Sequence, residues 1–380
     1  MENIYLDNSA TTRIDDRVLE EMLPYLKSNY GNASSLYSLG RESKKAIEDA
    51  RDKVAKFLNC KSSEIYFTSG GSESDNTAIK GIARANRKKG NHIITSKIEH
   101  RAVLETCKTL EKEGFEITYL DVDRYGRVDI EKLKSVIRKD TILISIMYAN
   151  NEIGTIQDIE KIGKIARENG ICFHTDAVQA VGILDIDVEK QNIDSLSLSA
   201  HKFYGPKGIG VLYVKKNIKF EKFIDGGHQE RNKRAGTENV ANIVGLAKAL
   251  EIATESLQAH KNKISSLRDY FESNLKSKIE NATINGDIEN RLPGNSNISF
   301  LGVNGQDLLL NLDMLGICVS SGSACTSGSI DPSHVLTAIG LDEEKAKSSI
   351  RISIGKYNTK EDIDYLIKNL VKIIKRQRDV

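Results

Sequence analysis

The sequence predicts an α/β protein: a large domain with a mainly parallel sheet flanked by helices, and a smaller α+β domain. Between residues 14 and 250, short and nearly continuous apolar runs alternate with segments of helical spacing, which is typical of parallel strands buried between helices. Beyond about residue 250 the pattern changes to a long charged helical stretch followed by shorter mixed elements. The chain has 380 residues, 39% of them hydrophobic, which suffices for two cores. We place the large domain at residues 14–250 and the small domain at residues 1–13 and 251–380.

The elements up to residue 214 follow from these patterns in order. Residues 5–12 are expected to form a strand and a turn. Helices are expected where apolar residues recur at helical spacing, at residues 15–27, 42–58, 72–89, 102–113, 130–137 and 159–169. Strands are expected in the apolar runs at residues 65–68, 92–96, 115–120, 141–148 and 171–175, and on both sides of a turn within residues 195–214. Ligands of such sheets bind at the carboxyl ends of the strands, so the residues there are the candidates for function.

The small domain is predicted from weaker patterns. Residues 241–275 have the spacing of one long helical stretch. Strands are expected at residues 297–300, 317–319 and 349–355, and helices at residues 305–315, 333–338 and 360–375.

Composition excludes several classes of function. Lys and Arg number 55 and Asp and Glu 53, a net charge of +2, so no global field favours nucleic acid or an anionic membrane. The N-terminus has no basic and apolar leader, and no apolar run approaches the about 20 residues of a membrane-spanning helix. Five cysteines without C-x-x-C spacing indicate a reducing, cytoplasmic location. We expect Cys172 and Cys318 to be buried core thiols, and Cys60 and Cys107 to be structural.

The stretch at residues 195–214 carries the first candidate for catalysis. An alternating strand ends at Ser199, His201 and Lys202, and a turn rich in Gly and Pro follows. A lysine fixed at a strand end between hydroxyl and imidazole groups suits Schiff-base chemistry, which needs a positioned and partly desolvated amine. The alternative is a surface lysine in a β-hairpin.

Two further strand ends carry groups suited to a phosphorylated ring. At residues 67–76 a strand ends in Thr-Ser-Gly-Gly, and a helix opens at Ser72. The exposed N–H groups and the small Gly71 would cradle a phosphate, although an ordinary strand-to-helix turn has the same signature. His100 follows another strand, where it could stack on a flat cofactor or carry a proton, or be structural.

Asp176 ends the apolar strand near residue 175, where a buried carboxylate needs a cationic partner. A protonated pyridinium nitrogen would serve, and Gln179 could donate to a ring hydroxyl. An aspartate before the lysine, at another strand end, is the arrangement of a pyridoxal phosphate enzyme. Metal binding by His174 and Asp176 is the alternative, but no further ligand cluster supports it, and we expect no metal.

Three more positions stand out. Asn150 and Asn151 follow a buried strand, where they would hold donors over a ligand or form a turn. Cys325 lies in a loop of small residues, about 320–332, in which a thiol would be exposed and available as a nucleophile, or incidental. Arg351 lies among apolar neighbours of an alternating strand and offers a fork for a carboxylate, or a structural ion pair.

Taken together and in this order, these motifs resemble those of the NifS/IscS-type cysteine desulfurases, within the class V aminotransferases. The resemblance runs from the Tyr-Leu-Asp-Asn-Ser-Ala-Thr-Thr at residues 5–12 to the strand of Arg351. The Ser-Ser-Gly-Ser-Ala-Cys at residues 320–325 points to the NifS/IscS branch rather than the SufS-like one. Ala33, Tyr37 and Ser72 depart from the usual Pro, His and Thr.

The resemblance implies pyridoxal 5'-phosphate transferase fold type I and a homodimer with the site at the subunit interface. Lys202 would form the Schiff base and move the α-proton, Asp176 would pair with the ring nitrogen, Gln179 would reach the ring hydroxyl, and His100 would stack on the ring. The phosphate would be held by Gly71, Ser72, Ser199 and His201, and by Thr237 of the partner subunit. Asn151, expected beside the cofactor, and Arg351 would hold the substrate carboxylate.

The implied reaction takes sulfur from L-cysteine. Cys325 would attack the substrate sulfur, giving L-alanine and an enzyme persulfide that passes to an acceptor protein. The acceptor stays open between an iron–sulfur cluster scaffold and a tRNA-thiolation enzyme. A selenocysteine lyase, a class V aminotransferase and a catalytically silent partner subunit are the competing hypotheses.

Overall fold

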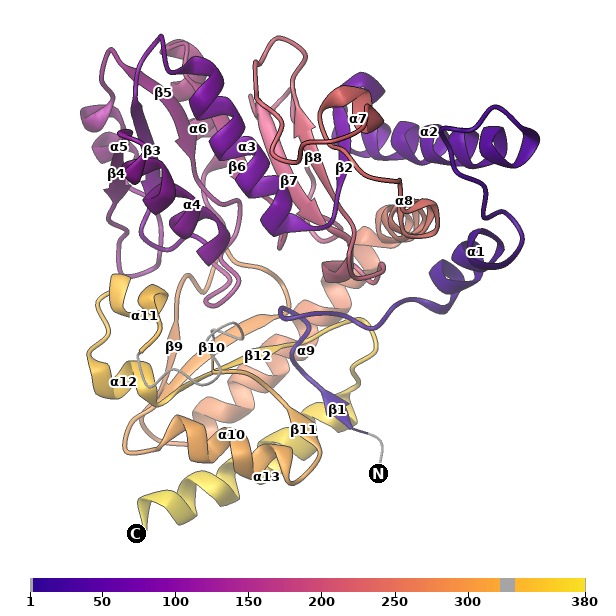
Figure 1. Cartoon of the computed structure of the whole chain (residues 1–380). Coiled ribbons are helices and arrows are strands. Elements are labelled where there is room, and N and C mark those ends of the chain that lie inside the picture. Colours follow the sequence, from indigo (N-terminus) through magenta and orange to yellow (C-terminus); the bar gives the residue numbers. More distant parts are fainter. Residues whose placement is uncertain (1–2, 322–331, 380) are drawn as a thin grey trace.

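The protein folds into two stacked parts, each with its own sheet (Figure 1). The structure is a computed structural model that describes residues 3–321 and 332–379. The chain starts in the lower part, builds the whole upper part, and returns to the lower part for its C-terminal third. The N-terminal segment therefore packs beside residues from the C-terminal third of the chain.

The upper part is built on a seven-stranded sheet in the order β2-β8-β7-β6-β5-β3-β4. Only β8 runs antiparallel to its neighbours, which confirms the predicted mainly parallel α/β fold. The strands are β2 (Ile65–Thr68), β3 (His92–Ser96), β4 (Glu116–Leu120), β5 (Thr141–Ser145), β6 (Cys172–Asp176), β7 (Ser195–Ser199) and β8 (Gly210–Val214).

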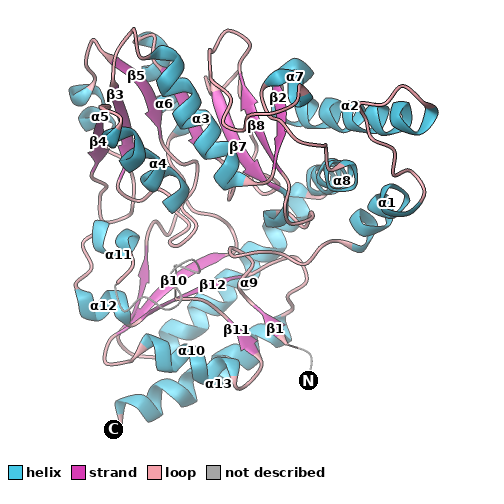
Figure 2. Ribbon diagram, viewed as in Figure 1, coloured by secondary structure: helices cyan, strands magenta, loops and turns pink. Residues whose placement is uncertain are grey.

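Helices cover both faces of this sheet (Figure 2). Successive strand residues point to opposite faces, so Ile93 belongs to a hydrophobic cluster with residues of α3 and α4, whereas Ile94 belongs to the cluster that contains residues of α2, α6 and α8. This two-sided burial explains the nearly continuous apolar runs. The helices and 3-10 turns are α1 (Asp16–Lys27), α2 (Ser38–Leu58), η1 (Ser62–Glu64), α3 (Gly71–Asn86), α4 (Arg101–Lys112), α5 (Ile130–Val136), α6 (Ile159–Glu168), η2 (Ala200–Lys202), α7 (Gln229–Asn232) and α8 (Val240–Glu255).

The lower part packs helices on a three-stranded antiparallel sheet, in the order β12-β10-β9. A parallel pair, β1 with β11, lies beside it. Ile298 and Ile350 of the sheet share a hydrophobic cluster with Phe271 and Leu366 of the helices. The elements are β1 (Ile4–Tyr5), α9 (Leu257–Lys278), β9 (Ala282–Asn285), β10 (Asn295–Phe300), α10 (Gly305–Asp313), β11 (Ile317–Cys318), α11 (His334–Ala338), α12 (Glu343–Lys347), β12 (Ser349–Ser353) and α13 (Lys360–Arg378).

The largest error of the sequence-based elements is the single helical stretch predicted at residues 241–275. The structure has two helices there, α8 and α9, which meet at Ser256. The Ser256 hydroxyl donates to the carbonyl of Ile252 at 2.8 Å, a side-chain bond that competes with continuation of the helix. Ile252 belongs to the hydrophobic cluster of the upper part, and Ile264 belongs to that of the lower part. This change lies close to residue 250, the predicted domain boundary, which stays a prediction.

The described cysteines are free thiols. Cys107 and Cys172 are buried as expected, whereas Cys318 and Cys60 are only partly buried. For Cys318 this corrects the expectation of a core thiol, because β11 is a two-residue strand in a two-stranded sheet. Among the described residues, no helix has the length and apolar character needed to span a bilayer.

Candidate active site

A cavity of about 250 Å³ lies where the carboxyl ends of the large sheet face the lower part. It gathers residues from strand ends, helix starts and the N-terminal segment. The predicted residues that line it are Gly71, Ser72, His100, Asn151, Asp176, Gln179, Ser199, His201, Lys202 and Arg351. Thr237 lies instead in a separate hollow with Arg234 and Gly236, and Cys325 lies outside the described residues.

Lys202 ends η2, directly after β7, and its amine points at the N-terminal segment. Nζ donates to the carbonyls of Ser9 and Ala10, at 2.6 Å and 2.8 Å. The same segment is held by Gln179, whose amide donates to the Ser9 carbonyl at 2.9 Å. Residues separated by 193 positions thus fix the amine in the cavity.

The start of α3 forms an anion cradle. Gly70 has a φ of +151°, a conformation suited to glycine, and a Cβ on Gly71 would lie 2.6 Å from Cγ2 of Val178. Ser199 lies against this turn, 3.6 Å from where a Cβ of Gly70 would be. Backbone N–H groups at a helix start attract phosphate. Burial lowers the pKa of His201 to about 4, so that it offers a neutral ring beside the cradle.

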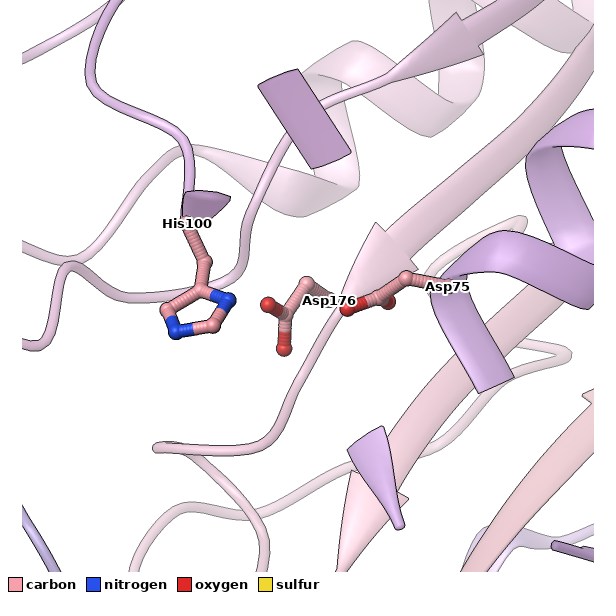
Figure 3. Close-up of side chains that lie close together, drawn as sticks. All are labelled: Asp75, His100 and Asp176. Atoms are coloured by element: carbon pink, nitrogen blue, oxygen red, sulfur yellow. The ribbon is translucent and has the colours of Figure 1, made fainter. Parts of the chain in front are cut away.

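Asp176 and His100 face each other across the cavity (Figure 3). Asp176 accepts a hydrogen bond from the Val178 N–H at 2.9 Å. Burial raises the pKa of Asp176, while His100, that N–H bond and Lys202 favour its ionised form. Nδ1 of His100 caps α4 by accepting from the Ala102 N–H at 3.1 Å, so Nε2 is the ring nitrogen that can carry a proton into the cavity.

The possible metal ligands that the structure brings together differ from the predicted pair of His174 and Asp176. His174 does not join Asp176, because its ring nitrogens bond the hydroxyls of Ser145 and Ser197, at 2.9 Å and 3.1 Å. Asp75 takes its place: oxygens of Asp75 and Asp176 and a nitrogen of His100 lie within 4.8 Å of one another.

The two asparagines have different roles. Oδ1 of Asn150 accepts from the N–H groups of Glu152 and Ile153, at 2.8 Å and 3.0 Å, and its amide donates to the Ile98 carbonyl. Asn150 therefore builds the turn, which was one of the two alternatives. Asn151 lines the cavity, and its carbonyl accepts from Nη1 of Arg351 at 2.9 Å.

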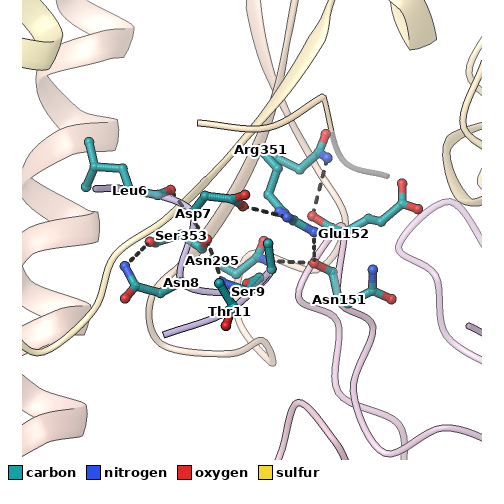
Figure 4. A network of polar contacts seen from close by, with 12 residues as sticks. Leu6, Asp7, Asn8, Ser9, Thr11, Asn151, Glu152, Asn295, Arg351 and Ser353 are labelled. Atoms are coloured by element: carbon teal, nitrogen blue, oxygen red, sulfur yellow. Dashed lines mark hydrogen bonds and ion pairs between the residues drawn. The ribbon is translucent and has the colours of Figure 1, made fainter. Parts of the chain in front are cut away.

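Arg351 forms the structural ion pair that was one of its two predicted roles, and it also lines the cavity. It is buried in β12, lines the cavity, and forms an ion pair with Asp7 at 2.6 Å (Figure 4). Its backbone bridges to Ser320, the residue that begins the loop of small residues. The guanidinium thus ties the lower sheet to the N-terminal segment and to the Asn151 turn.

Several cavity residues escaped the sequence reasoning: Ser9, Asp75, Glu152 and His334. Ser9 and Asp75 lie inside the motifs at residues 5–12 and 67–76, and this position in a motif was the only sequence signal that could have pointed to them. Glu99, directly before His100, is fully buried and bonds Ser96 and the Met147 N–H, at 2.6 Å and 3.0 Å. Burial raises the pKa of Glu99 to about 8.

The buried Glu99 predicts a pH-dependent stability. Because its pKa is raised from 4.5 to about 8 by folding, its contribution to stability is complete below about pH 4.5 and is lost as the pH rises towards 8. Glu99→Gln should lack this loss, so its stability relative to wild type should rise by a few kcal/mol, on the order of 4 kcal/mol, between about pH 4.5 and pH 8. Urea unfolding across this range measures the difference, with the exposed Glu20→Gln as control. Parallel pH profiles of wild type and Glu99→Gln would refute the assignment.

Comparison with known proteins identifies the family of the chain. The model of the class-V aminotransferase family matches residues 4–366. The chain belongs to the class-V aminotransferase family. It is 56% identical over 379 residues to the cysteine desulfurase IscS of Clostridium botulinum, covering 99% of this chain and 96% of the relative. It is 54% identical to the IscS of Dictyoglomus turgidum, covering 99% and 96%.

Two solved structures are also similar to this chain over most of its length. A NifS-like protein, 42% identical, has a TM-score of 0.93 and covers 98% of this chain and 100% of its own. The structure of SspA in complex with cysteine, 40% identical, has a TM-score of 0.83 and covers 94% and 100%. These matches confirm the predicted resemblance, the fold, and an enzyme of the cysteine desulfurase type. The family implies pyridoxal 5'-phosphate as cofactor.

Proposed function

We propose that this enzyme removes the sulfur of L-cysteine, releases L-alanine, and receives the sulfur on Cys325 for transfer to an acceptor protein. The observation that carries the proposal is the meeting of an amine, a carboxylate, an anion cradle and a guanidinium in one cavity. The 56% identity to a cysteine desulfurase supports the choice of substrate.

The donor set of the cavity fits pyridoxal phosphate. Gly71 and Ser72 at the start of α3, with Ser199 and His201, would hold the phosphate. Asp176 would bond the ring nitrogen, Gln179 the ring hydroxyl, and His100 would lie against the ring, with Lys202 providing the Schiff-base amine. When bound, the cofactor supplies an electron sink for negative charge that develops at the substrate α-carbon.

Residues of the chain itself bind the substrate, move its proton and accept its sulfur. Arg351 and Asn151 orient the substrate by its carboxylate, which fixes the α-proton near Nζ of Lys202. The Lys202 amine takes that proton and returns it to the α-carbon. The proton that leaves Cys325 when it becomes a thiolate goes to the β-carbon, which becomes the methyl group of alanine. The Cys325 thiolate forms a bond to the substrate sulfur as the bond between that sulfur and Cβ breaks. The balance is L-cysteine and an enzyme thiol in, and L-alanine and an enzyme persulfide out.

The proposal includes a homodimer. Thr237 lies away from the cavity of its own subunit, and we propose that it completes the phosphate site of the partner. Exposed apolar side chains along α1 and the following loop offer a surface for a second copy: Leu19, Leu23, Leu26, Tyr30, Leu36 and Tyr37. The mass in solution tests this. The acceptor protein and the cytoplasmic location stay predictions.

Removal of Cys325 separates this proposal from an aminotransferase. Cys325→Ala should lower steady-state alanine release from L-cysteine by at least about a hundredfold, because the nucleophile is lost. Cys318→Ala, at a partly buried thiol of β11, is the matched control and should retain turnover. Undiminished consumption of L-cysteine by Cys325→Ala, with a keto acid as product in place of alanine, would favour an aminotransferase and contradict the proposal. Undiminished alanine release would mean that sulfide leaves directly, which also contradicts the role of Cys325.

A further inference from the structure

A second carboxyl lies behind Asp176 that the proposed reaction does not use. Asp75 lies on α3, and its side chain points towards Asp176 at the end of β6 (Figure 3). Oxygens of the two carboxyls lie within 4.8 Å, and the residues are only 1% and 5% exposed. Two like charges this close in a buried site strongly disfavour full ionisation, so the pair is expected to retain a proton.

Two histidines lie near Asp75. A ring nitrogen of His100 is within 4.8 Å of an oxygen of Asp75, and also within 4.8 Å of an oxygen of Asp176. His174 approaches Asp75, with Nε2 at 3.7 Å from Oδ1, but this ring is held by two serine hydroxyls. Burial lowers the pKa of His174 to about 3, so the ring is neutral at physiological pH. Oδ1 of Asp75 has no hydrogen-bond partner in the part of the chain that the structure describes.

The surroundings decide which member of the pair keeps the proton. Asp176 accepts the Val178 N–H, and His100 and Lys202 favour its negative charge. For Asp75, burial and then the charge of Asp176 raise the pKa, and a bond to the Ser197 hydroxyl only partly opposes them.

We propose that Asp75 is a positioning residue: a carboxylic acid that stays protonated at neutral pH, so that Asp176 is the ionised member of the pair. This inference rests on the proposed function, in which an ionised Asp176 meets the cofactor ring. A neutral Asp75 fills the space behind Asp176 with a polar group and adds no second negative charge to the cavity.

Infrared spectroscopy of the holoenzyme tests this directly. Aspartate labelled with ¹³C at its side-chain carboxyl identifies the C=O stretching band of a protonated aspartic acid as the band that shifts with the label. We expect this band in wild type at pH 7, and we expect Asp75→Asn to abolish it. Asp176→Asn should retain the band, because burial, the largest influence on Asp75, persists without Asp176.

Two outcomes contradict the inference. A wild-type spectrum without the band overturns it, even if neither variant folds. A band that survives in Asp75→Asn places the proton on another carboxyl. The proposed function fails separately: if Asp176→Asn keeps the visible absorbance of the cofactor and wild-type turnover, then Asp176 does not serve the ring, wherever the proton lies.

Discussion

Lys202→Ala is expected to abolish the visible absorbance of the lysine-bound cofactor and to lower L-cysteine turnover by about a thousandfold or more. The amine is placed in the cavity by the carbonyls of Ser9 and Ala10, and no neighbouring group has the same position. Both the link to the cofactor and the group that moves the α-proton are therefore lost together. Absorbance spectra and alanine release measure the two effects.

Lys207→Ala is the matched control for this variant, because Lys207 is an exposed lysine in the turn that follows η2. It should keep both the absorbance and the turnover of wild type. If Lys202→Ala retained the wild-type spectrum, the Schiff base would have to form elsewhere, and the assignment of this cavity would be wrong.

Arg351→Lys should lower kcat/KM for L-cysteine by about 30- to 150-fold, mainly through KM, while the cofactor spectrum is retained. The lysine keeps the positive charge but cannot form the paired bonds of a guanidinium to a carboxylate, which corresponds to about 2–3 kcal/mol. Steady-state kinetics with L-cysteine and a cofactor titration separate the two effects.

The ion pair between Arg351 and Asp7 supplies the control. Asp7→Asn breaks this pair without touching the guanidinium. If Arg351 binds the substrate carboxylate, Asp7→Asn should leave KM close to the wild-type value. If Asp7→Asn raises KM as much as Arg351→Lys does, the arginine acts through the structure of the N-terminal segment and not on the substrate.

The sheet and its strand ends were accessible from the sequence for a clear reason. Burial on both faces gives strands such as Thr141–Ser145 a mainly apolar centre, so a cluster of polar residues where a strand ends is conspicuous. Asp176 and Lys202 were found in this way. The helix break at Ser256 was missed because a single serine bond to Ile252 outweighed the helical spacing on both sides.

The rest of the site depends on contacts that no local pattern contains. Ser9 reaches Lys202 across 193 positions, and Asp7 pairs with Arg351 across 344. Asp75 was overlooked because a carboxylate near a helix start usually faces solvent, whereas this one faces the sheet. The role that we propose for Thr237 requires a second subunit, so neither a local pattern nor a single chain contains the contact.

A single-turnover reaction with L-cysteine in the absence of reductant, followed by intact mass, tests the central claim most directly. We expect wild type to gain the mass of one sulfur atom as one alanine is released, and Cys325→Ala to gain none. Alanine released without any gain in mass would mean that sulfide leaves directly, and the proposed transfer to Cys325 would be contradicted.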